Sequence, residues 1–190
     1  TVHHLVLVRT LAQEPAGPFE CDTFFKPTWL PLFANGTGAA SLDLPSGSTF
    51  FLPKGTQLLV QLHLLNPSTD NQNDSVQIRL RRAAPTANLA GIYGFGTTKV
   101  ELPPNQKSDV TNDCTVESDV DVFAVFPHMH TRGTALSFQV GKNGAQPSEV
   151  YRVDPWNFDQ QAITPLSLKL APGDLTRVVC SYDNPTADTI

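Results

Sequence analysis

Histidine is the residue type whose placement in this 190-residue sequence carries the most chemical information. His3 and His4 are adjacent, His128 and His130 are separated by one residue, and His63 stands alone. Histidines scattered by chance would rarely give an HH pair and an HxH pair with only one left over. A neutral imidazole is the commonest side-chain metal ligand in proteins. All five histidines are therefore predicted to bind metal.

The His128-Met129-His130 segment comes at the end of an apolar stretch, Asp121–His128, that is predicted to be a strand. Residues i and i+2 of a strand face the same side, so both imidazoles can reach one ion. Met129, the only methionine of the sequence, then faces the opposite side. This geometry makes Met129 a poor third ligand for that ion.

The other three histidines pose a steric question. Successive residues of a regular strand face opposite sides, so His3 and His4 can bind one ion only where the strand is bulged, twisted or ending. His63 lies in an apolar stretch, where a lone imidazole would be costly without a metal or a hydrogen-bond partner. The alternatives are that HH is a surface pair or a tag remnant, and that His63 is a hydrogen-bonded core histidine.

Ligand chemistry alone does not choose the metal, because imidazole suits zinc, copper, iron and nickel alike. The sequence lacks the HExxH motif of zinc proteases. No carboxylate follows the HxH pair at the offset typical of cupins. Imidazole must be neutral to coordinate, so metal affinity is expected to fall below about pH 6.5.

The elements that must hold these histidines are predicted to be strands, because segments with apolar residues at alternate positions recur along the chain. Turn signals such as Pro103-Pro104-Asn105 and Pro172-Gly173-Asp174 separate them. No window keeps a helical apolar stripe, so almost no helix is expected. The predicted strands are Val2–Val8, Thr49–Leu52 with Gln57–Leu65 as a hairpin across Pro53-Lys54-Gly55, Ser75–Arg82, Ile92–Leu102, Asp109–Val116, Asp121–His128, Ala135–Val140, Glu149–Val153, Leu166–Leu170 and Leu175–Tyr182.

Composition supports an all-β fold of the sandwich or jelly-roll type. The 16 prolines exceed the roughly ten expected at this length from average usage, and proline is confined largely to turns, loops and strand starts. Strands with frequent turns are typical of antiparallel β-sandwiches. The Ala- and Pro-rich segment Arg82–Ala90 predicts a boundary between two domains, 1–88 and 89–190.

Charge and cysteine content restrict the partners and the compartment. The net charge is −5 and the only local concentration of cations is Arg79, Arg81 and Arg82, which argues against nucleic acid or anionic membranes as partners. No apolar run is long enough to span a bilayer. The three cysteines Cys21, Cys114 and Cys180 are an odd number, and Asn35-Gly-Thr and Asn73-Asp-Ser are possible glycan acceptors. These features weakly favour a secreted, extracellular or periplasmic protein with disulfides.

Taken in chain order, the histidine segments resemble those of the copper type II, ascorbate-dependent monooxygenases, the family of peptidylglycine and dopamine hydroxylases. The match covers nearly the whole chain. The segments that carry it are Val2-His3-His4-Leu5-Val6-Leu7, Leu52-Pro53-Lys54-Gly55, Leu59-Val60-Gln61-Leu62-His63, Leu80–Tyr93, Leu102–Cys114, Phe126-Pro127-His128-Met129-His130-Thr131-Arg132-Gly133, Pro172-Gly173-Asp174 and Cys180-Ser181-Tyr182-Asp183-Asn184.

The resemblance implies two copper sites in separate domains and ascorbate as the reductant. His3, His4 and His63 would hold the copper that stores and passes an electron. His128 and His130 would be the catalytic pair, holding the copper that activates dioxygen and hydroxylates a substrate C–H bond.

The resemblance also implies that both domains are partial here. The family has several strands before its His-His motif, so the first strands are expected to lie outside this chain. Its second copper has a methionine ligand, next to a cysteine, after the strand ending near Asn184, so these last strands are also expected outside this chain. That cysteine would be a partner for Cys180.

Two further positions bear on the substrate. Peptide-amidating members carry an arginine two residues before the HxH pair, where it can clamp a carboxylate, and here that position is Phe126. An uncharged small-molecule substrate is therefore expected beside dioxygen. Gln61 matches the family and is a candidate for structuring the space between the sites, although it could equally be a strand residue facing solvent.

Two other functions remain possible from the sequence. One is a non-catalytic copper-binding or copper-carrying β-sandwich. The other is a structural or adhesive module in which the histidines are incidental. The oligomeric state is left open.

Overall fold

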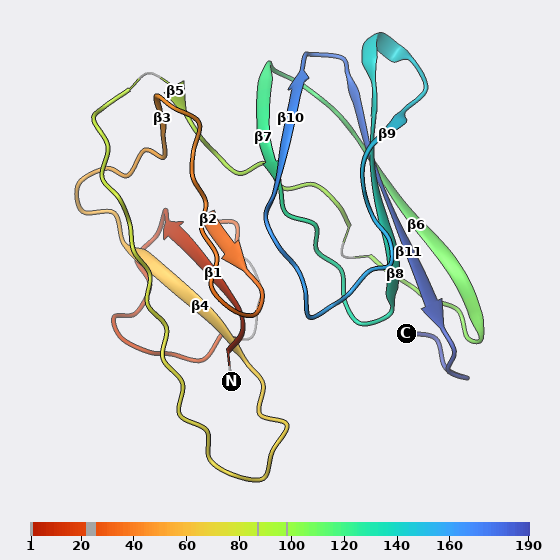
Figure 1. The fold of residues 1–190 in the computed structure, drawn as a ribbon, viewed down its shortest axis with the longest axis horizontal. Coiled ribbons are helices and arrows are strands. Elements are labelled where there is room, and N and C mark those ends of the chain that lie inside the picture. The colour runs from red at the N-terminus through yellow and green to blue at the C-terminus, as the bar shows by residue number, and fades with distance from the viewer. Residues whose placement is uncertain (1, 22–25, 87, 98) are drawn as a thin grey trace. The chain divides into compact units, whose positions relative to one another are not determined.

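The computed structural model describes residues 2–21, 26–86, 88–97 and 99–190. Clustering of backbone contacts divides the chain into two compact units, Thr1–Tyr93 and Gly94–Ile190. Both are built from β-strands (Figure 1), and within the described residues the only helical element is the 3-10 turn Lys142–Gly144. The expected all-β fold is confirmed. The boundary at 88/89 and the assignment of one copper site to each domain stay predictions.

The first unit is organised around β1 (Val2–Thr10), which lies between β2 (Trp29–Asn35) and β4 (Leu58–Leu64) in an antiparallel sheet. Both faces of β1 are buried. Leu5 and Leu7 pack with Leu32 on one face, and Val6 and Val8 pack with Trp29 on the other. Each such side chain contributes about 1.5–3 kcal/mol when fully buried, so β1 anchors this sheet. A second, parallel pair joins β3 (Ser48–Thr49) to β5 (Asn88–Leu89).

Strand β2 was not predicted from the sequence, because Pro31 lies inside it. Proline cannot donate to a sheet ladder and is tolerated at sheet edges and bulges. Both conditions hold here, since β2 is at the end of the strand order and the pairing with β1 shifts register between Leu7 and Val8.

One predicted hairpin and two predicted strands are wrong. The turn at Pro53 forms, with the Thr56 amide donating to the Pro53 carbonyl at 3.1 Å, but it closes no hairpin. Strand β4 pairs with β1 instead, which is a long-range contact that local patterns do not encode. Ser75–Arg82 and Ile92–Leu102 have no assigned strand among their described residues. The backbone of Gly96, at φ of 151°, falls in a region that ordinary strand residues rarely adopt.

The second unit is a β-sandwich. One layer is the antiparallel sheet β6 (Gln106–Thr115), β11 (Leu175–Asn184), β8 (Gly133–Gly141) and β9 (Ser148–Val153). The other layer pairs β10 (Thr164–Leu170) with β7 (Val120–Val125). Side chains of both layers share one core cluster, in which Phe138 and Val140 of β8 meet Leu170 of β10. All six strands correspond to predicted segments.

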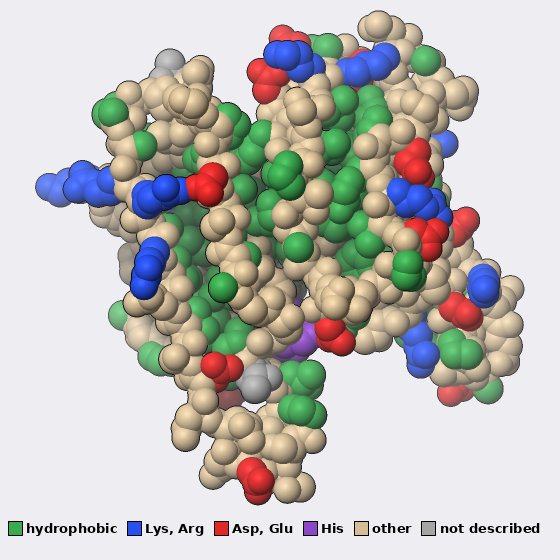
Figure 2. Space-filling model, viewed as in Figure 1, with side chains coloured by type: hydrophobic (Ala, Val, Ile, Leu, Met, Phe, Trp, Pro, Cys, Tyr) green, Lys and Arg blue, Asp and Glu red, His purple; other side chains and the backbone are tan. Residues whose placement is uncertain are grey.

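The described residues contain no helix that is long and apolar enough to cross a membrane. On the face shown in Figure 2, lysine and arginine side chains are interspersed with aspartate and glutamate. No disulfide joins Cys21, Cys114 and Cys180 in the part of the chain that the structure describes. The expected disulfides therefore stay a prediction.

Candidate metal centres

The first histidine cluster forms at one end of the β2-β1-β4 sheet, where β1 begins and β4 ends. His3 and His4 are on β1 and His63 is on β4. The ring centroids of His4 and His63 are 4.5 Å apart, and those of His3 lie 5.4 Å from His4 and 5.5 Å from His63. One ligand nitrogen from each ring can be chosen so that all three lie within 4.8 Å of one another. The structure therefore brings together the three histidines that the sequence placed in one site.

The nitrogen separations suit a single metal ion. The Nδ1 atom of His4 lies 3.2 Å from that of His3 and 3.4 Å from that of His63. Imidazole nitrogens bound at about 2.0–2.1 Å to one tetrahedral or trigonal ion lie about 3.3–3.6 Å apart. The three residues thus fit a three-coordinate imidazole site.

A β-bulge makes this convergence possible. Val2 pairs with Leu64 and His4 pairs with His63, so β1 has one extra residue, His3, between the two pairs. In a regular strand His3 and His4 would face opposite sides of the sheet, and the bulge removes that restriction. The expectation of an irregular strand at the HH pair is confirmed.

The environment of His63 differs from the expectation. The sequence placed His63 in a buried apolar strand, but its side chain is exposed, and most of β4 is exposed with it. The reason is that β4 is at the end of the strand order and pairs with β1 alone among the described strands. His3, at 7% exposure, is the buried member of the cluster.

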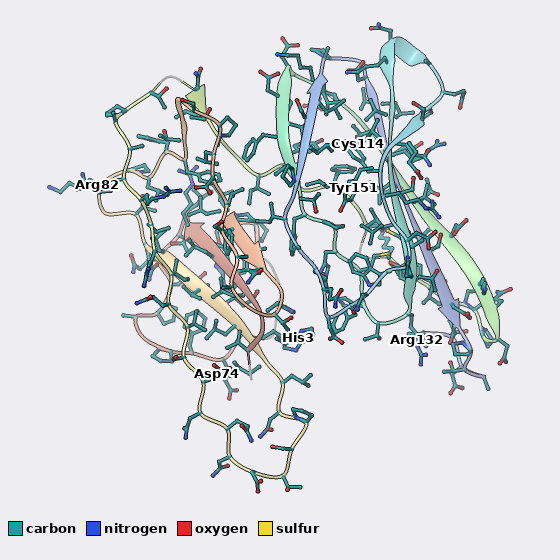
Figure 3. The ribbon with its side chains drawn as sticks, in the orientation of Figure 1. His3, Asp74, Arg82, Cys114, Arg132 and Tyr151 are labelled. Atoms are coloured by element: carbon teal, nitrogen blue, oxygen red, sulfur yellow. The ribbon has the colours of Figure 1, made fainter. Side chains whose placement is uncertain are left out.

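Two neighbouring side chains border the first cluster. Asp74 accepts a hydrogen bond from the Val2 amide at 2.8 Å, directly before the bulge, and lies at the same end of the sheet as His3 (Figure 3). Backbone hydrogen bonds from Val2 and then Ser75 lower the pKa of the Asp74 carboxyl. Gln61 donates from Nε2 to the Cys21 sulfur at 3.4 Å. Its proposed role between the two copper sites stays a prediction.

The second histidine cluster lies in the connection between β7 and β8. Strand β7 ends at Val125, so the predicted strand Asp121–His128 is too long, and His128 and His130 follow the ladder rather than belonging to it. Pro127, which cannot donate to a ladder, comes directly before His128. The two imidazole centroids are nevertheless 5.3 Å apart with ring planes at 85°.

Burial alternates through the HxH segment as predicted from the spacing. His128 and His130 are exposed, whereas Met129 between them is only 3% exposed. Met129 packs into a core cluster with Leu102, Leu136 and Tyr182. Its side chain therefore faces away from the two imidazoles.

Gln161 orients the ring of His128. The Nε2 group of Gln161 donates to the Phe158 carbonyl at 2.8 Å, which turns the amide oxygen toward His128 Nδ1 at 2.7 Å. With an oxygen acceptor in place, Nδ1 carries the proton and Nε2 keeps its lone pair for a metal. Such a partner on the second ring nitrogen is typical of metal-binding histidines.

The same loop reaches His130. The Phe158 ring lies 6.3 Å from the His130 ring in an edge arrangement. Sequence analysis did not identify Gln161 or Phe158 as site residues, because both lie in the connection between β9 and β10 and reach the site only through the tertiary fold. The run of aromatic and amide residues at 156–161 was the only local signal.

The ionisation of His128 favours ligation. Part of the His128 side chain is exposed, but loss of solvent around the ring is still the main cause that lowers its pKa; the hydrogen bond to Gln161 acts in the opposite direction, and the neighbouring His130 lowers the pKa further. The ring is therefore neutral at neutral pH, as a metal ligand must be.

The core side chains that pack with Met129 next to the second cluster are uncharged. Tyr182 and Cys180 lie two residues apart on β11 beside Met129. Burial raises the pKa of Tyr182 to about 12 and also raises the pKa of the Cys180 thiol. Both side chains stay neutral at physiological pH, so they add no charge beneath the imidazoles. Phe126, the other substrate-side candidate, is half-buried after the end of β7.

Comparison with known proteins identifies the family of the chain. A family model described as "Copper type II ascorbate-dependent monooxygenase, C-terminal domain" matches residues 88–190, more than half of the chain. The human protein named "Putative DBH-like monooxygenase protein 2" is 23% identical over 215 aligned positions, which cover 100% of this chain and 43% of that protein. The chain thus spans less than half the length of this curated relative. The matched segment, with the HxH pair in it, shows that the chain belongs to the copper type II ascorbate-dependent monooxygenase family.

Proposed function

We propose that this chain carries the two copper sites of a monooxygenase that hydroxylates a substrate C–H bond with dioxygen and ascorbate. The observation that supports this most directly is the convergence of His3, His4 and His63 from two strands, with His4 Nδ1 at 3.2 Å from His3 Nδ1 and 3.4 Å from His63 Nδ1. The family of the second unit supplies the choice of copper among the metals that imidazole binds.

The two clusters would divide the reaction between them. Bound copper would supply one-electron redox chemistry at both clusters and a place for dioxygen at the second. His3, His4 and His63 would hold the ion that stores an electron, and His128 and His130 would hold the catalytic ion. One oxygen atom enters the C–H bond and the other leaves as water, with two electrons and two protons supplied through ascorbate.

The side chains of the second cluster would prepare the site before substrate arrives. Gln161 keeps the proton of His128 on Nδ1, so that Nε2 is available without a tautomer change. The lowered pKa of His128 keeps the ring unprotonated at neutral pH. A fixed ring and a fixed tautomer reduce the reorganisation that binding would otherwise require.

The substrate is proposed to be small, uncharged and partly apolar. Phe126 occupies the position at which peptide-amidating members of the family have a carboxylate-binding arginine, and Phe158 presents an aromatic ring near His130. Both rings offer apolar contact area, and neither offers a charged group that could bind a carboxylate. We further expect no nucleic-acid partner, because the chain is acidic and has no large cationic cluster. We expect a secreted, extracellular or periplasmic location from the three cysteines and the two possible glycan acceptors.

The test is metal analysis followed by an activity assay. Full-length protein prepared without added metal should contain copper and show a copper redox signal. With ascorbate and dioxygen it should hydroxylate an uncharged aromatic amine or alcohol, and His128→Ala should abolish product formation. Zinc at full occupancy would contradict the copper assignment. Copper binding without ascorbate-dependent oxygen consumption would favour the copper-carrying alternative.

A further inference from the structure

We propose that Gly133 is a positioning residue of the second histidine cluster, because its missing side chain lets the His130–Gly133 turn close onto Met129 and Trp156. This inference rests on the proposed role of His128 and His130 as copper ligands. Gly133 itself touches neither reacting atoms nor a metal-binding nitrogen.

A methyl group at Gly133 would fit only if the flexible end of Met129 moved and if Trp156 and the His130 carbonyl also shifted by a few tenths of an ångström. A Cβ atom built on it would lie 2.8 Å from Cε of Met129, 3.0 Å from Cδ1 of Trp156 and 3.2 Å from the His130 carbonyl oxygen. All three separations are shorter than ordinary van der Waals contact between such atoms. The requirement is purely steric, since the backbone of Gly133 is not among the positive-φ residues.

The turn cannot retreat from these contacts without breaking backbone hydrogen bonds. The Gly133 amide donates to the His130 carbonyl at 3.0 Å and closes the turn. On one side the Asp183 amide donates to the Arg132 carbonyl at 2.9 Å, and on the other the Trp156 amide donates to the Thr134 carbonyl at 2.8 Å. Arg132 marks this end of β8 in Figure 3.

The two side chains against Gly133 connect it to the imidazoles. Met129 lies between His128 and His130 in sequence and is held in the core, so a shift of the Met129 backbone would move both histidines. Trp156 packs against the same core and belongs to the connection that also carries Phe158 and Gln161. A methyl group at Gly133 would push on both supports of the cluster at once.

The test is the copper affinity of Gly133→Ala in the full chain. A His63→Ala background weakens the first cluster, so that copper binding reports the second. Competition with a copper chelator should show affinity about tenfold or more below that background, as expected when groups that orient metal ligands are disturbed. The electron paramagnetic resonance spectrum of bound Cu(II) should change as well.

Two matched glycines provide the controls. Gly94→Ala meets no atom within 4 Å and has no positive φ, so copper affinity and spectrum should not change. Gly141→Ala, at the opposite end of β8, would place Cβ 2.2 Å from the Ala145 carbonyl oxygen and should lower the thermal midpoint. The spectrum of bound copper should nevertheless stay unaltered in Gly141→Ala. This control shows that a general loss of stability does not by itself change the spectrum.

A second-site change separates positioning from instability. Met129→Leu removes the Cε atom at nearly constant volume, so the pair Met129→Leu with Gly133→Ala should recover part of the lost affinity. Unchanged affinity and spectrum in Gly133→Ala would overturn the inference, as would equal effects of Gly133→Ala and Gly141→Ala on the spectrum. If the His63→Ala background binds no copper while wild type does, the proposed role of His128 and His130 fails, and the inference fails with it.

Discussion

The two histidine clusters are assembled by different structural means. In the first cluster, backbone pairing brings the side chains together, because a bulge at His3 and the register of β1 with β4 place three imidazoles next to one another. In the second, side chains outside the ligand set do the work, because Gln161 orients His128 and Met129 anchors the segment in the core. The number of imidazoles brought together in the first cluster is set by sheet register, whereas the orientation of the imidazoles in the second is set by packing and a buried amide.

The largest effect should follow removal of a ligand from the cluster that depends on register. His63→Ala removes one of the three imidazoles of the first cluster, and we expect the copper content to fall by about one ion per chain because the weakened cluster loses its ion during buffer exchange. Elemental analysis after buffer exchange measures this directly. Leu62→Ala, one residue earlier on β4, is the control and should keep its copper. Full copper content in His63→Ala would show that the first cluster is not a metal site.

A smaller effect should follow loss of the orienting amide. Gln161→Leu removes the acceptor for His128 Nδ1, so both tautomers become available and the affinity of the second cluster should fall about 10–100-fold. Chelator competition gives the affinity, and Gln160→Leu at the exposed neighbouring position is the control. If Gln161→Leu binds copper as tightly as wild type, packing alone orients His128 and the contrast between the clusters weakens.

The pH dependence of copper binding should show protons competing with copper for His128. Because the folded-state pKa of His128 is lowered, protons compete with copper only below the ordinary value of about 6.5. Copper on the second cluster should therefore be retained as pH falls to about 6.5 and lost progressively below it. For the metal-free protein, the unfolded chain takes up the proton first, so stability declines from about pH 6.5 down to the folded pKa and then levels off. Copper titrations across this range test the first statement, and binding that stays flat down to pH 5 would contradict imidazole ligation.

The smallest effect should come from the hydrogen bond next to the bulge. Asp74→Ala removes the acceptor for the Val2 amide, and because Asp74 is exposed we expect copper affinity at the first cluster to fall by less than about threefold. Asp74→Asn keeps an acceptor oxygen and should restore most of the affinity. A loss as large as that in His63→Ala would mean that the bulge, rather than the ligand set, limits binding.

The sequence predicted the strands of the second unit because each has alternating apolar residues between turn residues. It also singled out the five histidines, because their spacing is unusual, and the structure brings them into two groups; that they are metal ligands stays a prediction. It failed at β2, where Pro31 masks an edge strand, and at the partner of β4, which is set by contacts with β1 far along the chain. It did not identify Gln161, since a contact across 33 residues depends on how β9 and β10 are joined.

Because β4 is exposed, an ion bound at the first cluster would also affect how firmly this strand is held in its sheet. Leu58, Val60, Leu62 and Leu64 are each 39–64% exposed on a strand that pairs on one side only among the described residues. An edge strand of this kind can pair with a strand of another protein chain. An ion bound by His63 on β4 and by His3 and His4 on β1 would hold the two strands together. Loss of the metal should therefore loosen β4 from the sheet and promote self-association of the protein. Faster amide hydrogen exchange in β4 of the metal-free protein would reveal that loosening, and equal rates with and without copper would refute it.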